Sequence, residues 1–375
     1  MTRGSILVGG AVAQKPGSGG HAWVFLQYLL GFQRLGFDVL FVDRLEADMD
    51  ERGAAWLDDV MHAAGLADSY SLLRTGEVEP LAGRSRRDVV EFAQSADFFL
   101  NVMGYVDDEE ILGASRRRVF VDIDPGFGQM WRALGLHDLF AGHDAFVTVG
   151  ERVGTDGCTV PDCGLDWIGT RPPVVLEHWP EQRGPGDRYT SVATWRGPFA
   201  PIEYEGRTYG LRVHEFRKFV ALPRVTGRPF ELALDIHENE TGDLELLREN
   251  GWTLVEPAVA AGSLDAYRSY VQGSRAELMV AKGIYVDTRG GWFSDRSACY
   301  LASGRPVIAQ DTGLEELYPL GEGLVVFSTV DEAAAAVEAV ERDYGRHARA
   351  ARRVAEEALD SDVVLGRLLD RLGAG

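Results

Sequence analysis

Residues 5–42 read SILVGGAVAQKPGSGGHAWVFLQYLLGFQRLGFDVLFV, and this stretch decides the fold. Its two ends, SILVG and FDVLFV, are short apolar runs of the kind that form buried parallel strands. Between them, a glycine-rich loop is followed from His21 to Leu35 by apolar residues at helical spacing, and Gly36 is suited to end that helix. A strand, a helix and a second strand in this order form a βαβ unit, so the sequence predicts a parallel sheet.

The same alternation continues along the chain. Further strands are expected at residues 98–102, 119–123, 145–149 and 174–176. Proline, glycine and charged residues without apolar periodicity predict a hinge near residues 178–190. The α/β rhythm then restarts, with strands expected at 191–194, 230–235, 252–255, 277–281, 306–309 and 323–327. We therefore expect an α/β protein with two Rossmann-like, doubly wound domains, residues 1–180 and 190–355.

Composition narrows the classes of partner. The formal net charge of the 375 residues is −20, so nucleic acid and anionic membrane surfaces are not expected partners. The basic residues are almost all arginine, which we interpret as a mark of GC-rich bacterial coding; the lysines are Lys15, Lys218 and Lys282. Three cysteines cannot form a disulfide framework, and no apolar run reaches the ~20 residues of a membrane span. We expect a reduced, cytoplasmic protein that is a monomer or a homodimer.

The loop before the first helix contains Gly17-Ser18-Gly19-Gly20-His21. Glycines allow a ligand to approach the backbone closely, and free amides at a helix start attract anions. His21 is expected above the carboxyl edge of the sheet, where it is either a general base or simply part of the helix start. The spacing is not that of a dinucleotide fingerprint, although Asp43, at the end of the next strand, keeps a nicotinamide site open as an alternative.

Two carboxylates, Asp122 and Asp124, end the strand expected at 119–123. They are candidates for a metal or acid/base pair, against an acceptor-side or structural role. We expect no metal, and Asp124 is a second candidate for the base or for a group that orients His21.

A second motif, from Ile284 to Gly313, lies in the C-terminal half. Ser294 or Asp295 can cap a helix whose start suits a diphosphate, and Gly304 ends that helix. The following strand delivers Gln310 and Asp311 to a loop, where they can accept hydrogen bonds from sugar hydroxyls. Each residue alone is typical of a surface turn, so the ordered series carries the prediction.

The order of helix, small residue, Gly304, Pro306, strand and polar loop resembles the donor site of the GT-B glycosyltransferases. The Gly19-Gly20-His21 motif with its helix is also similar to that superfamily, which includes the enzyme that adds N-acetylglucosamine to the peptidoglycan lipid precursor. The resemblance implies two domains facing across a cleft, a nucleotide-sugar donor on the C-terminal domain, and a small-molecule acceptor on the N-terminal domain. It also implies a C-terminal helix, residues 356–375, that packs back on the N-terminal domain, and no metal or other cofactor.

The resemblance further implies roles for single residues. His21 stands where many inverting members keep an acceptor-activating histidine, with Gly19 and Gly20 in the acceptor-side loop. The diphosphate contacts implied are Arg196, Arg212, Ser294, Asp295, Arg296 and Ser297, and the donor-sugar contacts are Gln310, Asp311 and Thr312. Cys299 replaces the ribose-binding glutamate of many retaining members.

The expected activity is therefore inverting sugar transfer from a nucleotide diphosphate to a small molecule, in specialised-metabolite or antibiotic biosynthesis. Alternatives are a nucleotide-sugar 2-epimerase, for which Glu315 and Glu316 are the extra carboxylates, and a non-catalytic sugar-nucleotide-binding protein.

Overall fold

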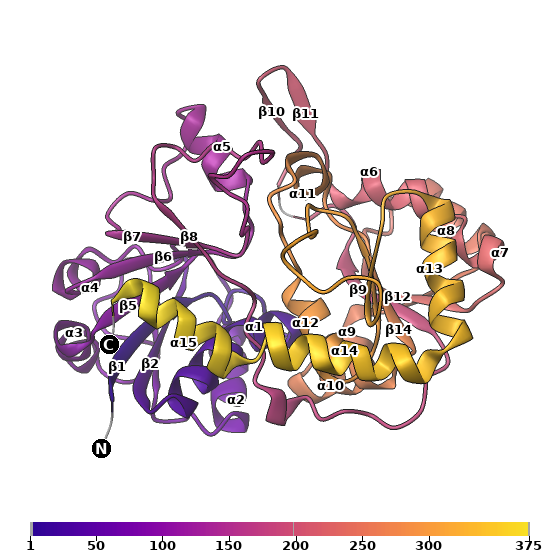
Figure 1. Ribbon diagram of the computed structural model, residues 1–375. Coiled ribbons are helices and arrows are strands. Elements are labelled where there is room, and N and C mark those ends of the chain that lie inside the picture. Colours follow the sequence, from indigo (N-terminus) through magenta and orange to yellow (C-terminus); the bar gives the residue numbers. More distant parts are fainter. Residues whose placement is uncertain (1–2, 198, 374–375) are drawn as a thin grey trace.

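The computed structural model describes residues 3–197 and 199–373, which form two α/β domains (Figure 1). The first sheet has the strand order β4-β3-β2-β1-β5-β6-β7-β8, parallel throughout except that β4 is antiparallel to β3. Its strands are β1 (Gly4–Gly10), β2 (Phe37–Leu45), β3 (Tyr70–Arg74), β4 (Ala82–Gly83), β5 (Phe98–Val102), β6 (Arg118–Asp122), β7 (Ala145–Thr148) and β8 (Trp167–Gly169). The helices of this domain are α1 (Gly19–Arg34), α2 (Arg52–Ala63), α3 (Arg86–Ser95), α4 (Glu109–Ala114) and α5 (Phe127–Ala133).

The second sheet is wholly parallel, with the order β13-β12-β9-β14-β15-β16. Its strands are β9 (Tyr189–Thr194), β12 (Phe230–Asp235), β13 (Trp252–Val255), β14 (Ala276–Met279), β15 (Val307–Gln310) and β16 (Leu324–Phe327). Its helices are α6 (Arg212–Phe216), α7 (Leu222–Thr226), α8 (Thr241–Glu249), α9 (Pro257–Ala261), α10 (Leu264–Gly273), α11 (Gly283–Thr288), α12 (Asp295–Ala302) and α13 (Val330–Arg342). The two sheets, one formed by the first half of the chain and one by the second, confirm the predicted α/β fold with two Rossmann-like domains.

The strand predicted at residues 174–176 is wrong. The chain there enters a 3-10 turn, Leu176–His178, after the buried residues Val174 and Val175. The Val174 amide donates to the carbonyl of Leu359 at 2.8 Å, and Val174 in turn accepts from Ser361 at 2.9 Å. The apolar run is therefore buried by a segment near the C-terminus instead of by a neighbouring strand.

The last two helices are α14 (Tyr344–Ala358) and α15 (Ser361–Leu372), so the C-terminal helix expected at 356–375 begins at Ser361; residues 374 and 375 lie outside the described ones. Asp360 caps α15 by accepting from the Asp362 amide at 3.0 Å. Figure 1 shows α14 along the second domain and α15 across the first, where Asp362 pairs with Arg34 of α1 at 3.0 Å. Within the described ranges, no helix combines the length and apolar character needed to cross a membrane.

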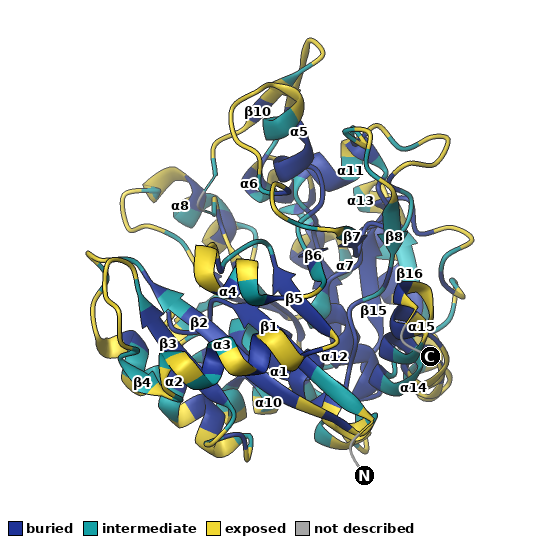
Figure 2. Cartoon of the chain, turned by 90° about the vertical axis from the view of Figure 1, so that its left-hand side faces the viewer, coloured by how far each residue is buried: buried dark blue, intermediate teal, exposed yellow. Residues whose placement is uncertain are grey.

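The two domains are in direct apolar contact. One hydrophobic cluster contains Phe25 and Val8 of the first domain together with Tyr267 and Ile284 of the second. Figure 2 shows that both sheets are buried and that the exposed residues lie mainly on the outer helices and loops. Above the interface, the hairpin β10 (Ile202–Tyr204) and β11 (Arg207–Tyr209) lies beside α5 (Figure 1). The apolar contact between the two domains brings the carboxyl end of β6 close to that of β14.

Candidate active site at the domain interface

An ion pair between the domains marks the centre of the candidate site. Asp124 follows β6 of the first domain, and Lys282 follows β14 of the second. The Lys282 Nζ donates to both carboxylate oxygens of Asp124, at 2.9 and 2.7 Å. The same ammonium lies 5.2 Å from the ring centroids of Phe127 and Tyr285, one from each domain. Lys282 is therefore held at the meeting point of the two sheets.

A second lysine, Lys15, lies near this pair on the loop between β1 and α1. Neighbouring protein atoms partly desolvate the Lys15 side chain, although the residue is exposed, and this lowers its pKa; Asp124 and Asp295 oppose the shift and Lys282 adds to it. The loop that resembles an acceptor site therefore also presents a positive charge to the interface.

Arg212, the first residue of α6, is the third cation of the site. Its Nε is buried and has no hydrogen-bond partner in the part of the chain that the structure describes. Burial and, to a lesser extent, the nearby Arg296 lower the pKa of Arg212 to about 10, while Asp124 is among the carboxylates that oppose the shift. A buried, unsatisfied guanidinium donor is costly, and phosphate oxygens match its planar fork.

Arg196, which the sequence paired with Arg212, lies elsewhere. Its side chain is exposed and forms an ion pair with Glu240, with Nη2 donating to Oε2 at 2.9 Å. The structure therefore brings Arg212 close to Asp124 and leaves Arg196 exposed and paired with Glu240. The diphosphate role implied for Arg196 is not supported by this placement.

Some residues at the start of α12 lie at the interface between the domains, and others lie against the sheet of the C-terminal domain. Ser294 accepts from the Arg296 amide at 3.2 Å, so the predicted cap is confirmed. Arg296 donates to Glu277, whose side chain is 0% exposed, and to the carbonyl of Val192 at 2.8 Å. Its guanidinium neutralises a carboxylate inside the domain, so its contacts favour a structural role over the implied diphosphate role.

Asp295 and Ser297 complete this helix start. Asp295 lines a small cavity between the domains, together with Tyr28 of α1 and Ile123 after β6. Burial raises the pKa of Asp295, and Arg296 and Arg212 oppose the shift. The Ser297 hydroxyl is buried and has no partner among residues 3–197 and 199–373. A carboxylate at this helix start opposes the binding of a diphosphate directly against it.

The three implied sugar contacts all have internal partners. Gln310 accepts from the Ala281 amide at 3.1 Å and donates to Glu215 at 2.7 Å. Asp311 accepts from Arg289 and from the Gly313 amide, both at 2.8 Å, and the Thr312 hydroxyl donates to the carbonyl of Trp292 at 2.6 Å. These residues lie at the predicted strand end, where their hydrogen bonds hold the loop in place. To bind a sugar they would have to break these internal hydrogen bonds.

His21 is poorly suited to be the base. Its Nε2 lies 3.0 Å from the carbonyl oxygen of Ala11, to which it donates in the neutral form. Burial and, to a lesser extent, Lys15 lower the pKa of His21 to about 3, and a helix start also disfavours a cation. The ring therefore stays neutral and its Nε2 holds the loop, so this geometry does not favour the acceptor-activating role implied by the resemblance.

The glycines beside His21 serve contact between the domains. A Cβ on Gly19 would lie 2.1 Å from the carbonyl oxygen of Ser263, and one on Gly20 would lie 2.8 Å from the Tyr267 ring. Both contacts are with the second domain. Gly19 and Gly20 thus allow α1 to approach α10. The sequence motif alone had predicted that these glycines allow a ligand to approach the backbone.

Other buried carboxylates are structural. Asp43 accepts from the Ala13 amide at 2.7 Å, and burial raises its pKa to about 7, so it holds the loop instead of a nicotinamide ribose. Asp122 accepts from Gln129 at 2.6 Å and Thr148 at 3.0 Å, and burial raises its pKa to about 6. Across the described residues, no three His, Cys, Asp or Glu side chains gather as a metal site.

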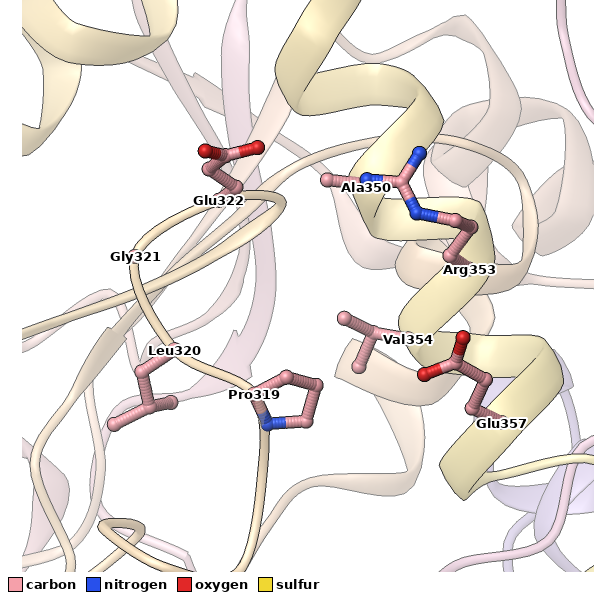
Figure 3. A pocket seen from close by; sticks show the side chains of 8 residues that line it. All are labelled: Pro319, Leu320, Gly321, Glu322, Ala350, Arg353, Val354 and Glu357. Atoms are coloured by element: carbon pink, nitrogen blue, oxygen red, sulfur yellow. The ribbon is translucent and has the colours of Figure 1, made fainter.

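Two further features lie apart from these cations. Cys299 is buried against the first domain, with its Sγ 3.8 Å from Gln27 Nε2. A surface hollow lies between the 319–322 loop and α14 (Figure 3), and its lining includes Glu322, Arg353 and Glu357. This hollow belongs to the C-terminal domain alone and shares no residue with the interface.

The sequence interpretation therefore found Arg212 and Asp124 but missed Lys15 and Lys282. The signal that marks both is their residue type, since lysine is rare in this chain.

Comparison with known proteins agrees with this architecture. A family model described as glycosyl transferase-like matches residues 222–365. Comparison with curated protein sequences gives no match. Among solved structures, Staphylococcus aureus TarM, in a complex that contains UDP, is similar with a TM-score of 0.63 and 7% identity, covering 98% of this chain and 99% of its own.

Two more structures span both chains almost completely. HepE of Anabaena, in complex with UDP-glucose, gives a TM-score of 0.60 and 12% identity over 99% of this chain and 100% of its own. An alpha-glucosyltransferase in complex with UDP and a 13-mer DNA containing an HMU base gives a TM-score of 0.59 and 10% identity. The match covers 100% of this chain and 100% of its own. At these identities the likeness establishes a shared two-domain fold.

Proposed function

We propose that the chain, which shares a two-domain fold with solved glycosyltransferases and matches a glycosyl transferase-like family model over residues 222–365, is a glycosyltransferase that moves a sugar from a nucleoside-diphosphate donor held at Arg212 to a hydroxyl of a small-molecule acceptor held at Asp124. Arg212 carries the proposal, because its buried Nε has no hydrogen-bond partner among the described residues. An anion with several oxygens supplies what this guanidinium lacks. The donor is expected to contain UDP, which accompanies the three relatives named above.

Lys15 and Lys282 extend the cation set from Arg212 towards the acceptor domain. Lys282 donates a hydrogen bond to the Asp124 carboxylate. Lys15 interacts electrostatically with the same carboxylate. Positive charge near the leaving phosphate stabilises the charge that develops as the sugar–phosphate bond breaks. This arrangement needs no metal ion, and the absence of any cofactor stays a prediction.

Asp124 is the proposed general base. In an inverting transfer, the acceptor oxygen forms a bond to the anomeric carbon while the bond from that carbon to the phosphate oxygen breaks. The acceptor proton passes to the Asp124 carboxylate, and the diphosphate leaves with the bonding electron pair. Asp124 is favoured over His21 because it is a carboxylate at the carboxyl end of β6, whereas His21 Nε2 is engaged by Ala11.

Retention of configuration is a second candidate. One relative is named an alpha-glucosyltransferase, and the TarM complex contains alpha-GlcNAc-glycerol. In that case the leaving phosphate oxygen takes the acceptor proton, and Asp124 binds the acceptor hydroxyl without acting as the base. The anomeric proton coupling of the product, measured by NMR, separates the two outcomes.

A thermal-shift screen tests the donor site. At a concentration of 100 times Kd, a ligand of the folded state adds about 2.7 kcal/mol of stability. The correct nucleoside diphosphate, screened among UDP, dTDP, GDP and ADP, should raise Tm, and Arg212→Gln should abolish the rise. Arg196→Gln is the matched control and should keep it. An unchanged rise in Arg212→Gln contradicts the proposal.

Release of the diphosphate separates the enzyme from a silent binding protein. A nucleotide sugar that stabilises the chain but never yields a nucleoside diphosphate, with any acceptor or water, favours the binder. A donor converted to its 2-epimer favours the epimerase, although Glu315 already pairs with Arg289 at 2.9 Å.

A further inference from the structure

The Lys282–Asp124 pair joins two groups that the proposed function assigns to opposite substrates. Lys282 belongs to the cations around the donor diphosphate, and Asp124 faces the acceptor. In the structure, however, each is the partner of the other, through two hydrogen bonds of 2.9 and 2.7 Å. The carboxylate of Asp124 and a diphosphate are thus competing anions for one ammonium.

The position of Lys282 allows it to change partners. It follows β14 and comes directly before α11, so its backbone is fixed while its four-carbon side chain can swing. The side chain of Lys282 is 20% exposed to solvent and that of Asp124 is 22% exposed, so neither is fully buried. The segment before Arg212 lies against the start of α11, since the Ile284 amide donates to the Gly210 carbonyl at 3.2 Å, so an anion bound at Arg212 comes close to Lys282.

We propose that Lys282 is a gate operated by the donor: diphosphate binding draws its ammonium away from Asp124 and so frees the carboxylate for the acceptor hydroxyl. Until then, Asp124 is neutralised by a charge-assisted pair and is a poor partner for a hydroxyl group. The consequence is a compulsory order, in which the donor binds before the acceptor. The inference rests on the proposed function and holds for either stereochemical course.

The three lysines of the chain make this directly observable. Protein labelled with ¹³Cε-lysine should give three lysine environments by NMR, assigned with Lys15→Arg and Lys218→Arg. Inorganic pyrophosphate is the probe. Without it, the Lys282 signal should differ between the wild type and Asp124→Asn; at saturation the two should coincide, because the pair is then broken in both. Lys218, which pairs with Glu215, is the internal reference.

Affinity gives a second readout. If Asp124 competes for Lys282, then Asp124→Asn should bind pyrophosphate at least threefold more tightly than the wild type. Asp265→Asn is the matched control, because it removes the same charge from an exposed carboxylate that pairs with Arg268. Its affinity should stay within a factor of 1.5 of the wild type.

A Lys282 signal that keeps its ligand-free position in the saturated wild type overturns the gate, as does an Asp124→Asn affinity no tighter than that of Asp265→Asn. Failure of every nucleoside diphosphate and of pyrophosphate to bind the folded wild type overturns the proposed function, and the gate with it. An unchanged melting temperature and Lys218 signal show that each variant is folded.

Discussion

Arg296→Gln tests the assignment of Arg296 to the interior of the C-terminal domain. The guanidinium donates to Glu277 of β14 and to the carbonyl of Val192 in β9, so it joins two neighbouring strands. The Glu277 side chain is 0% exposed, and glutamine would leave its carboxylate without a counter-charge. Removing one partner of a buried pair costs about 3–5 kcal/mol of folding free energy.

Urea unfolding of the purified variant measures this loss. With an m-value of about 3 kcal/mol/M, the midpoint of the affected transition should fall by about 1–1.7 M. Arg346→Gln removes one partner of an exposed pair in the same domain and should leave the midpoint unchanged. The double variant Arg296→Met, Glu277→Leu removes both charges and should recover most of the loss.

The competing hypothesis is that Arg296 binds the donor diphosphate, as the family resemblance implied. It predicts the opposite pattern: a normal urea midpoint with loss of the thermal shift caused by the nucleoside diphosphate. Observation of that pattern would refute the structural role, as would a double variant no more stable than Arg296→Gln alone.

Three further predictions concern the interface. Asp124→Asn should lower kcat at least ~100-fold if Asp124 is the base, whereas His21→Gln should lower it less than ~10-fold; steady-state kinetics of both variants decides the assignment. Because the folded pKa of His21 is about 3 and the unfolded value 6.5, its neutral form stabilises the protein above pH 6.5, and this stability is lost as pH falls. By pH 5 the loss is up to about 2 kcal/mol, so the wild type should lose more urea stability between pH 7.5 and 5.0 than His21→Gln, and equal losses would contradict the burial argument. Gly19→Ala would place its Cβ 2.1 Å from the Ser263 carbonyl oxygen and should lower Tm and kcat/KM together, whereas Gly242→Ala, in open space, should affect neither; normal values for Gly19→Ala would refute the close approach of the domains.

The parts of the fold that the sequence predicted are those with local signals. The helix expected at 295–302 matches α12 because Ser294 caps its start and Gly304, with a φ of +70°, follows its end. The strand expected at 174–176 failed because the burial of Val174 and Val175 depends on the segment around Leu359, far along the chain. The β10–β11 hairpin was missed for a similar reason, since its short strands have little apolar pattern to detect.

The candidate site shows the same division between local and distant causes. Arg196 and Arg212 are equivalent as sequence features, each close to the expected start of an element. Glu240 pairs with Arg196, and Arg212 is left with a buried, unsatisfied Nε. Likewise, the sequence indicates that a histidine follows two glycines, but the pKa of His21 depends on burial and on Lys15. Partners distant in sequence therefore decided which residues of the right chemical type face the interface.

The rarity of lysine was the one unused signal that pointed to both missed cations. Arginine is a planar fork that holds one geometry, whereas lysine is a compact charge on a flexible stem, suited to a change of partner. Lys218 pairs with Glu215 on the surface, with 59% of its side chain exposed. Lys282 pairs with Asp124 across the domain interface, and Lys15, which is exposed, lies close enough to feel the same carboxylate. We interpret the scarcity of lysine as coding bias, and coding bias does not explain why two of the three lysines lie near one carboxylate.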